Sequence, residues 1–136
     1  MLPLSDDFRE QMIAHAREQF PKECCGMLAG VDGKPVNVVR ATNSEESEFR
    51  YRVDDQDLLR FLRDNDDNGW DFLAVYHSHT RSEAYPSPTD VRLASNWPDP
   101  YYVLVSLEDQ ENPVVRAFRI TDGEISEVPT GDDAVA

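Results

Sequence analysis

One stretch of the chain determines both its fold and its chemistry: DFLAVYHSHTRSEAYPSPTD, residues 71–90. After Asp71, residues 72–76 are apolar, β-branched or aromatic, and the run 71–76 predicts a strand. Side chains at i and i+2 share one face of a strand, so His77 and His79 are expected to point the same way. Two imidazoles would then converge on one point at the end of this strand.

Asp90 lies just beyond the loop that follows the histidines. A catalytic zinc takes three protein ligands of nitrogen or oxygen type and keeps one position open for water. His77, His79 and Asp90 form such a set. The stretch therefore predicts a mononuclear zinc site and metal-assisted hydrolysis.

The same residues also permit a purely structural interpretation. Ser87 suits a helix N-cap, Pro88 suits the first helical position and Asp90 suits the third. An isolated His-x-His can likewise be surface decoration. Both interpretations remain possible for each motif alone, but the two motifs together at this spacing favour the metal site.

The spacing His-x-His, seven residues, Ser-x-x-Asp resembles the signature of the JAMM (MPN-plus) metalloproteases. That resemblance implies zinc held by His77, His79 and Asp90. It implies that Glu23, which opens the segment 23–30, acts as general base. Ser87 matches the serine that donates a hydrogen bond to the developing oxyanion. Cys25 is a conceivable ligand, but the set of three is complete without it.

Within the family, the chain is most similar to the prokaryotic branch whose peptidases release cysteine from a ubiquitin-like sulfur-carrier protein. Many ubiquitin isopeptidases have proline after the second histidine, whereas this chain has Thr80. The similarity rests on residues 23–26, 76–80, 83–87, 89–91 and 101–106. It implies a partner with a flexible, glycine-rich C-terminal tail that enters as an extended strand.

Two other functions stay open on the sequence. An isopeptidase that removes ubiquitin-like modifiers from lysine would use the same residues with a different leaving group. A non-catalytic scaffold domain of the same fold would typically lack the metal ligands. Nucleobase deaminases need His-x-Glu and Pro-Cys-x-x-Cys, and neither occurs here.

Two loop residues are candidates for substrate contact. Arg81 and Tyr85 lie between the second histidine and Ser87, next to the predicted metal. We hypothesise that Arg81 binds the carboxylate of a departing cysteine. An exposed loop arginine without such a role is the alternative.

Composition limits the partners. With 136 residues, 40% of them hydrophobic, the chain fits a single globular domain. The net charge of −14 argues against nucleic acid and anionic membranes as partners. This acidity could reflect a salty cytoplasm or simply a solvated acidic face. The composition does not indicate an oligomeric state.

Cysteine usage and the N-terminus predict a cytoplasmic protein. Cys24 and Cys25 are adjacent, which suits neither an ordinary disulfide between them nor a zinc ribbon. We expect both to be small core residues. The N-terminal residues show no signal-peptide pattern.

The periodicity of the chain predicts an alternating α/β order. Ser5 should cap a helix that Pro21 ends, and Asp54 or Asp55 should open a second helix buried through Leu58, Leu59 and Leu62. A third helix should run from Asp90 to about Asn96. Strands are expected at 24–29, 36–41, 49–53, 71–76, 101–107, 114–121 and 124–128.

The family resemblance adds a three-dimensional expectation. It implies a single JAMM/MPN-like α/β domain over residues 1–130, with a polar tail at 131–136. A curved mixed sheet should be flanked by helices. The metal should lie where the His77 strand meets the Asp90 helix.

Overall fold

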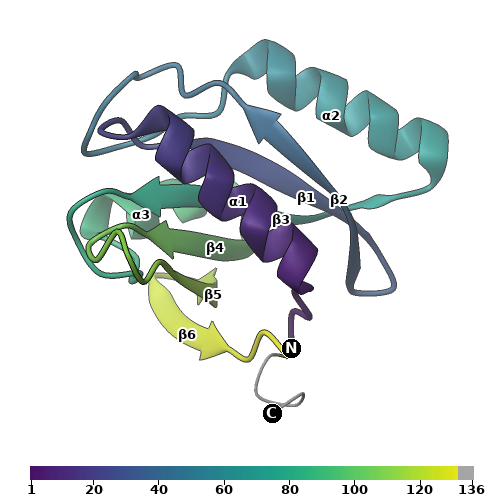
Figure 1. Ribbon diagram of the computed structural model, residues 1–136. Helices are drawn as coiled ribbons and strands as arrows, with labels where there is room; N and C mark the ends of the chain where they lie inside the picture. Colours follow the sequence, from purple (N-terminus) through teal and green to yellow (C-terminus); the bar gives the residue numbers. More distant parts are fainter. Residues whose placement is uncertain (132–136) are drawn as a thin grey trace.

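The computed structural model describes residues 1–131 and contains three helices and six strands in alternating order (Figure 1). The elements are α1 (Asp6–Gln19), β1 (Cys25–Val31), β2 (Lys34–Ala41), α2 (Asp55–Asn68), β3 (Asp71–His79), α3 (Pro88–Ala94), β4 (Tyr101–Ser106), β5 (Val114–Thr121) and β6 (Glu124–Val128). No helix among them could span a membrane. The predicted tail at 131–136 lies, apart from Gly131, outside the described residues.

The strands form one mixed sheet in the order β2-β1-β3-β4-β5-β6. Only β3 and β4 are parallel, and α3 lies in the connection between them. All other neighbours are antiparallel. The histidine strand β3 is therefore an interior strand, with β1 and β4 on its two sides.

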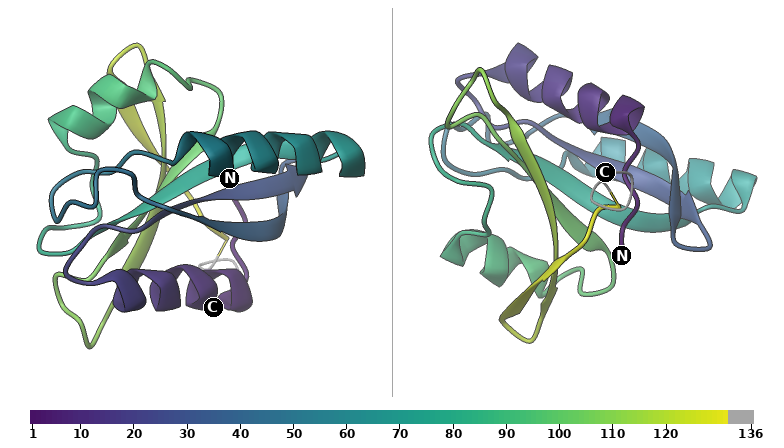
Figure 2. Two further views of the ribbon diagram at one scale, coloured as in Figure 1. Left: turned by 90° about the horizontal axis from the view of Figure 1, so that it is seen from above. Right: turned by 60° about the horizontal axis from the view of Figure 1, so that its bottom comes forward.

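Helices cover both faces of the sheet (Figure 2). On one face α1 packs through Met12 and Ala16 against Tyr76 and the buried side chains around it. On the other face α2 and α3 pack through Phe61 and Ala94. The predicted mixed sheet flanked by helices is confirmed.

The predicted helix boundaries follow from local capping. Ser5 caps α1 by accepting a hydrogen bond from the Phe8 N–H, and Asp54 caps α2. Gly69 ends α2 in the left-handed conformation, with φ 69°. Ser87 caps α3, which ends at Ala94 rather than at Asn96.

Two local predictions were wrong. Residues 49–53 alternate in polarity but form no strand, and only a single bridge between Asn43 and Val53 is present. The segment is a loop held by the Asn43 side chain, which bonds the Arg50 carbonyl and the Arg52 N–H, and by the Ser44 N–H, which donates to the Arg52 carbonyl. In α2, Leu59 is 45% exposed, whereas Phe61 is the buried apolar residue.

A buried polar pair connects α1 to the histidine strand. Nδ1 of His15 lies 2.7 Å from the Tyr76 hydroxyl, and both side chains are buried. Gly26 makes this possible, because a Cβ there would lie 2.3 Å from Cε1 of the Tyr76 ring. Burial, followed by the nearby Arg40 guanidinium, lowers the pKa of His15 to about 4, against an opposing effect of Glu18.

His15 should make stability fall with acid. Its pKa is lower in the folded than in the unfolded chain, so the unfolded chain binds more protons below pH ~6.5. Between pH 7.5 and 4.5 the unfolding free energy of wild type should fall by about 2–3 kcal/mol more than that of His15→Gln. This magnitude follows from about 1.36 kcal/mol per unit of pKa difference. Urea denaturation of both proteins with a chelator present measures this. An equal pH dependence in the two proteins would contradict it.

Candidate metal centre

The end of β3 brings the two histidines together on one face of the sheet. His77 and His79 are its last alternate residues, and they lie on the same face as Val75, which packs against α2 and α3. In the antiparallel register Cys25 is opposite His77. Continuing that register by two residues places Glu23 opposite His79. The fold thus collects the two predicted ligands and the predicted base at one end of two adjacent strands.

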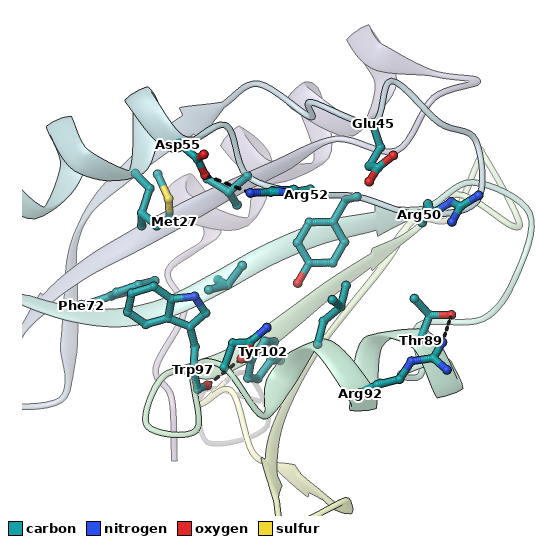
Figure 3. Close-up of a pocket in the computed structure, with 16 residues that line it drawn as sticks. Met27, Glu45, Arg50, Arg52, Asp55, Phe72, Thr89, Arg92, Trp97 and Tyr102 are labelled. Atoms are coloured by element: carbon teal, nitrogen blue, oxygen red, sulfur yellow. Dashed lines mark hydrogen bonds and ion pairs between the residues drawn. The ribbon is translucent and has the colours of Figure 1, made fainter.

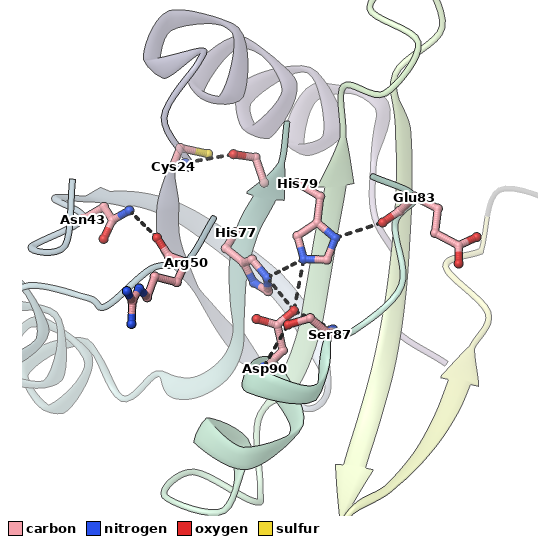
Figure 4. A network of polar contacts seen from close by, with 9 residues as sticks. Cys24, Asn43, Arg50, His77, His79, Glu83, Ser87 and Asp90 are labelled. Carbon is pink, nitrogen blue, oxygen red and sulfur yellow. Dashed lines mark hydrogen bonds and ion pairs between the residues drawn. The ribbon is translucent and has the colours of Figure 1, made fainter. Parts of the chain in front are cut away.

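Asp90 completes a tight cluster of donor atoms, shown in Figure 4. The Nε2 atoms of His77 and His79 are 3.2 Å apart. Oδ2 of Asp90 lies 3.1 Å from the first and 3.0 Å from the second. All three side chains are buried.

These distances fit a tetrahedral zinc. With metal–ligand bonds of about 2.0–2.1 Å, tetrahedral ligand atoms lie about 3.3 Å from one another. Three donor atoms about 3.1 Å apart could therefore hold one such ion, and a catalytic zinc site with three protein ligands keeps a further position for water. The donor set of two imidazoles and one carboxylate is also a typical zinc set.

The ring of His79 is held in the tautomer that a metal ligand needs. Its Nδ1 lies 2.9 Å from the Glu83 carbonyl, which can only accept, so Nδ1 carries the proton. In the neutral ring, Nε2 then presents its lone pair to the cluster. His77 is held differently, by the Tyr51 ring stacked on it with centroids 4.1 Å apart.

Asp90 carries the negative charge of the cluster. Burial alone would raise the pKa of Asp90, but the charge of His77 and hydrogen bonds from His77, His79 and the Ser87 N–H together hold it well below its usual range. Burial lowers the pKa of His77. Burial also acts to lower the pKa of His79, but hydrogen bonds to Asp90 and to the Glu83 carbonyl raise it overall. The lone pairs of the two Nε2 atoms and of Oδ2 of Asp90 face one another and repel. A proton or a metal cation between them is therefore required to stabilise the arrangement.

Glu23 lies buried two residues before β1, 5% exposed. Burial raises its pKa to about 8; nearby His79 opposes the shift and Asp90 adds to it. Its Oε1 is buried without a hydrogen-bond partner in residues 1–131. A cation at the cluster would favour the carboxylate form. This unpartnered oxygen suits a group that takes up a proton during a reaction.

Ser87 combines capping with a free donor. Its Oγ accepts from the Asp90 N–H at 3.1 Å, while its own N–H donates to Oδ2 of Asp90 at 2.9 Å. This capping box fixes the Asp90 carboxylate toward the histidines. The Ser87 hydroxyl proton is donated to no group in the described part of the chain.

The two predicted substrate residues lie outside the donor cluster. Arg81 is exposed and forms an ion pair with Glu48 at 3.0 Å. Tyr85 packs edge-on against Phe118, and the Arg116 guanidinium lies 5.9 Å from its ring centre. Neither residue is brought into contact with the histidines or Asp90, and their roles remain predictions.

Sequence reasoning did not find Asn43, which organises the loop 43–53. Its Nδ2 donates to the carbonyls of Glu23 and Arg50, at 3.0 and 3.1 Å. Its Oδ1 accepts from the N–H groups of Glu45 and Arg52, both at 3.0 Å. One carboxamide therefore closes the loop and ties it to the candidate base.

The same loop contacts both Glu23 and His77. The carbonyl of Ser47 accepts from the Glu23 N–H at 2.8 Å, so both backbone groups of Glu23 bond to this loop. Tyr51, which stacks on His77, lies on the loop as well. A sequence signal existed only as an Asn and a Tyr in a polar stretch, which many loops share.

Replacing Asn43 with Asp tests this positioning. The carboxylate keeps the two acceptor contacts but cannot donate to Glu23 or Arg50. We expect kcat to fall about tenfold or more on a cleavable substrate, since misplacing a reacting group is costly. KM and bound metal should stay near wild type. The matched control is Asn65→Asp, a buried amide in α2 away from the cluster; equal kcat losses in both variants would contradict the proposed role.

Comparison with known proteins gives matches over most of the chain. Residues 5–121 match the family model for prokaryotic homologues of the JAB domain. The chain is 43% identical to the CysO-cysteine peptidase of Mycobacterium tuberculosis over 131 residues, which cover 95% of this chain and 89% of the relative. It is 35% identical to a desampylase of Haloferax volcanii over 112 residues, covering 77% and 80% of the two chains.

A solved structure of similar shape supports the fold. The solution structure of a protein from Desulfitobacterium hafniense superposes with a TM-score of 0.85 at 34% identity. The match covers 94% of this chain and 90% of that one. The overall fold is thus shared with an experimentally solved protein.

Proposed function

The chain belongs to the prokaryotic JAB family, whose peptidases are metalloproteases, and we propose that it is a zinc peptidase that releases cysteine from a ubiquitin-like sulfur-carrier protein. The observation that carries this proposal is the buried cluster of His77, His79 and Asp90 beside Oε1 of Glu23, which has no hydrogen-bond partner in residues 1–131. The 43% identity to a CysO-cysteine peptidase over nearly the whole chain supports the substrate class.

Each side chain has a role that follows from its place. His77, His79 and Asp90 would hold the metal through the three atoms that face one another. A zinc ion bound there supplies Lewis acidity that activates water and polarises a carbonyl. Glu23 takes a proton from the attacking water and returns it to the leaving amine. Ser87 donates a hydrogen bond from its free hydroxyl to the carbonyl oxygen as that oxygen becomes negative.

The reaction is the hydrolysis of one amide bond. Water adds to the carbonyl of the last glycine of the carrier tail, and the bond from that carbon to the cysteine nitrogen breaks. The products are a carrier that ends in a glycine carboxylate and free cysteine. A flexible glycine tail suits this site, because the donor cluster is buried and small side chains let a chain approach it closely.

An isopeptidase is the second candidate, favoured by the similarity to a desampylase. The same residues would hydrolyse a bond to a lysine side chain, so the two activities differ only in the leaving group. Faster cleavage of a lysine conjugate than of a carrier-cysteine adduct would favour this alternative. In either case we propose a cytoplasmic location, which the buried free Cys24 and Cys25 support.

Two substitutions test the assigned chemistry. We expect Glu23→Gln to abolish cleavage of a peptide ending in Gly-Gly-Cys while zinc binding persists, because the amide cannot accept the proton.

Ser87→Ala should lower kcat by about 10²–10³-fold, the usual effect of losing one oxyanion donor. The activity of both variants is measured as release of free cysteine, detected with a thiol-specific dye.

The control for Ser87 is another helix cap. Ser5→Ala removes the N-cap of α1, so it should cost a similar stability of about 1 kcal/mol without changing kcat. If Ser87→Ala retained full activity, the hydroxyl would serve as a cap alone. Full activity in Glu23→Gln would overturn the assignment of the base.

A further inference from the structure

A groove of about 670 Å³ lies between α2 and α3 (Figure 3). Its apolar lining includes Met27, Phe72, Val75 and Tyr102 from the sheet and Leu58 and Leu93 from the helices. Its size is within the range of pockets that bury a small ligand or a short peptide segment. None of these residues has a role in the hydrolysis described above.

The groove leads to the donor cluster. Val75 lines it, and His77 lies two residues further along the same face of β3. Tyr51 lines the groove and also stacks on the His77 ring. Thr89, another lining residue, directly precedes Asp90. The groove and the donor cluster are therefore adjacent, because Tyr51 borders both.

The two ends of the groove differ in character. Figure 3 shows Phe72 and Trp97 together toward one end, where their rings lie 5.5 Å apart. Arg50 and Arg92 lie toward the other end, on opposite walls and on the side of Thr89. The cationic end is thus the one nearest the cluster, and the apolar end lies further away.

These arginines are unusual in a chain with 27 acidic and 13 basic residues. Arg52 pairs with Asp55 at 3.4 Å, and the Arg92 guanidinium donates to the Thr89 hydroxyl at 3.3 Å. Among residues 1–131, neither Arg50 nor Arg92 has a carboxylate partner, although Glu45 also lines the groove. Both guanidinium groups remain available to carboxylates of a bound chain.

We propose that this groove selects substrates whose residues just before the terminal glycines are acidic, with an apolar residue before those. The inference rests on the proposed function and specifies its substrate. The carrier is the larger part of the substrate and needs the larger surface, whereas a departing cysteine needs little room. The acidic side chains of the carrier tail bind Arg50 and Arg92. The apolar side chain that precedes them in the tail packs between Phe72 and Trp97.

Binding of two short peptides tests the selection without relying on cleavage. The probes are fluorescein-labelled Leu-Leu-Asp-Glu-Gly-Gly and Leu-Leu-Asn-Gln-Gly-Gly, which differ only in charge and contain no cysteine to release. Fluorescence anisotropy with the zinc-loaded protein gives each Kd. We expect the acidic peptide to bind about fivefold or more tightly, with the difference shrinking in high salt.

A double substitution locates the effect. Arg50→Gln with Arg92→Gln should remove the preference for the acidic peptide. Arg17→Gln with Arg63→Gln, which removes the same charge from exposed positions on α1 and α2, should keep it. Equal binding of both peptides to wild type, or an unchanged preference in the groove variant, would overturn the inference.

Cleavage of the same sequences extended by cysteine separates this inference from the proposed function. Loss of acidic preference in KM, with kcat unchanged in the groove variant, would support both. Selective binding without any cleavage by wild type would support the groove and reject the peptidase. Cleavage with no charge preference would support the peptidase and reject the groove.

Discussion

The carboxylate of Asp90 meets two imidazoles and a backbone N–H within 3.1 Å in a buried site, and the arrangement of the site depends on that meeting. A buried carboxylate is costly unless charge and hydrogen bonds compensate it. Here the compensation comes from the end of an interior strand and from the first turn of α3. Moving either element would leave a buried charge without its partners.

The fold explains how so short a chain holds this cluster. The parallel pairing of β3 and β4 requires a crossover between them, and α3 within it carries Asp90 back to the end of β3. The antiparallel β1 delivers Glu23 to the same end. The loop 43–53 then seals the arrangement, with Asn43 bound to the Glu23 carbonyl and Tyr51 stacked on His77.

Much of this was predictable, because it depends on local rules. The alternation that ends in His77 and His79 predicts their common face, and the Ser87–Asp90 capping pattern predicts where α3 begins. The fold class and the family were recognised from the same motifs. That Glu23 would lie opposite His79 could not be derived from local pattern, since strand register is a long-range property.

The errors occurred where tertiary contacts override local pattern. Residues 49–53 alternate like a strand, but the Asn43 side chain bonds the Arg50 carbonyl and the Arg52 N–H, which a neighbouring strand would otherwise bond. Leu59 is exposed because the buried face of α2 is centred on Phe61. The groove could not be predicted at all, as its walls come from α2, α3 and a loop that are distant in sequence.

The central claim is that His77, His79 and Asp90 hold one metal ion, and native mass spectrometry of the zinc-supplied protein tests it most directly. The account predicts one zinc per chain in wild type, and its loss in Asp90→Ala. Asp109→Ala, which removes a carboxylate from an exposed turn, should retain the ion. No zinc in wild type, or equal zinc in wild type and Asp90→Ala, would contradict the account and leave Ser87 to Asp90 as a helix cap.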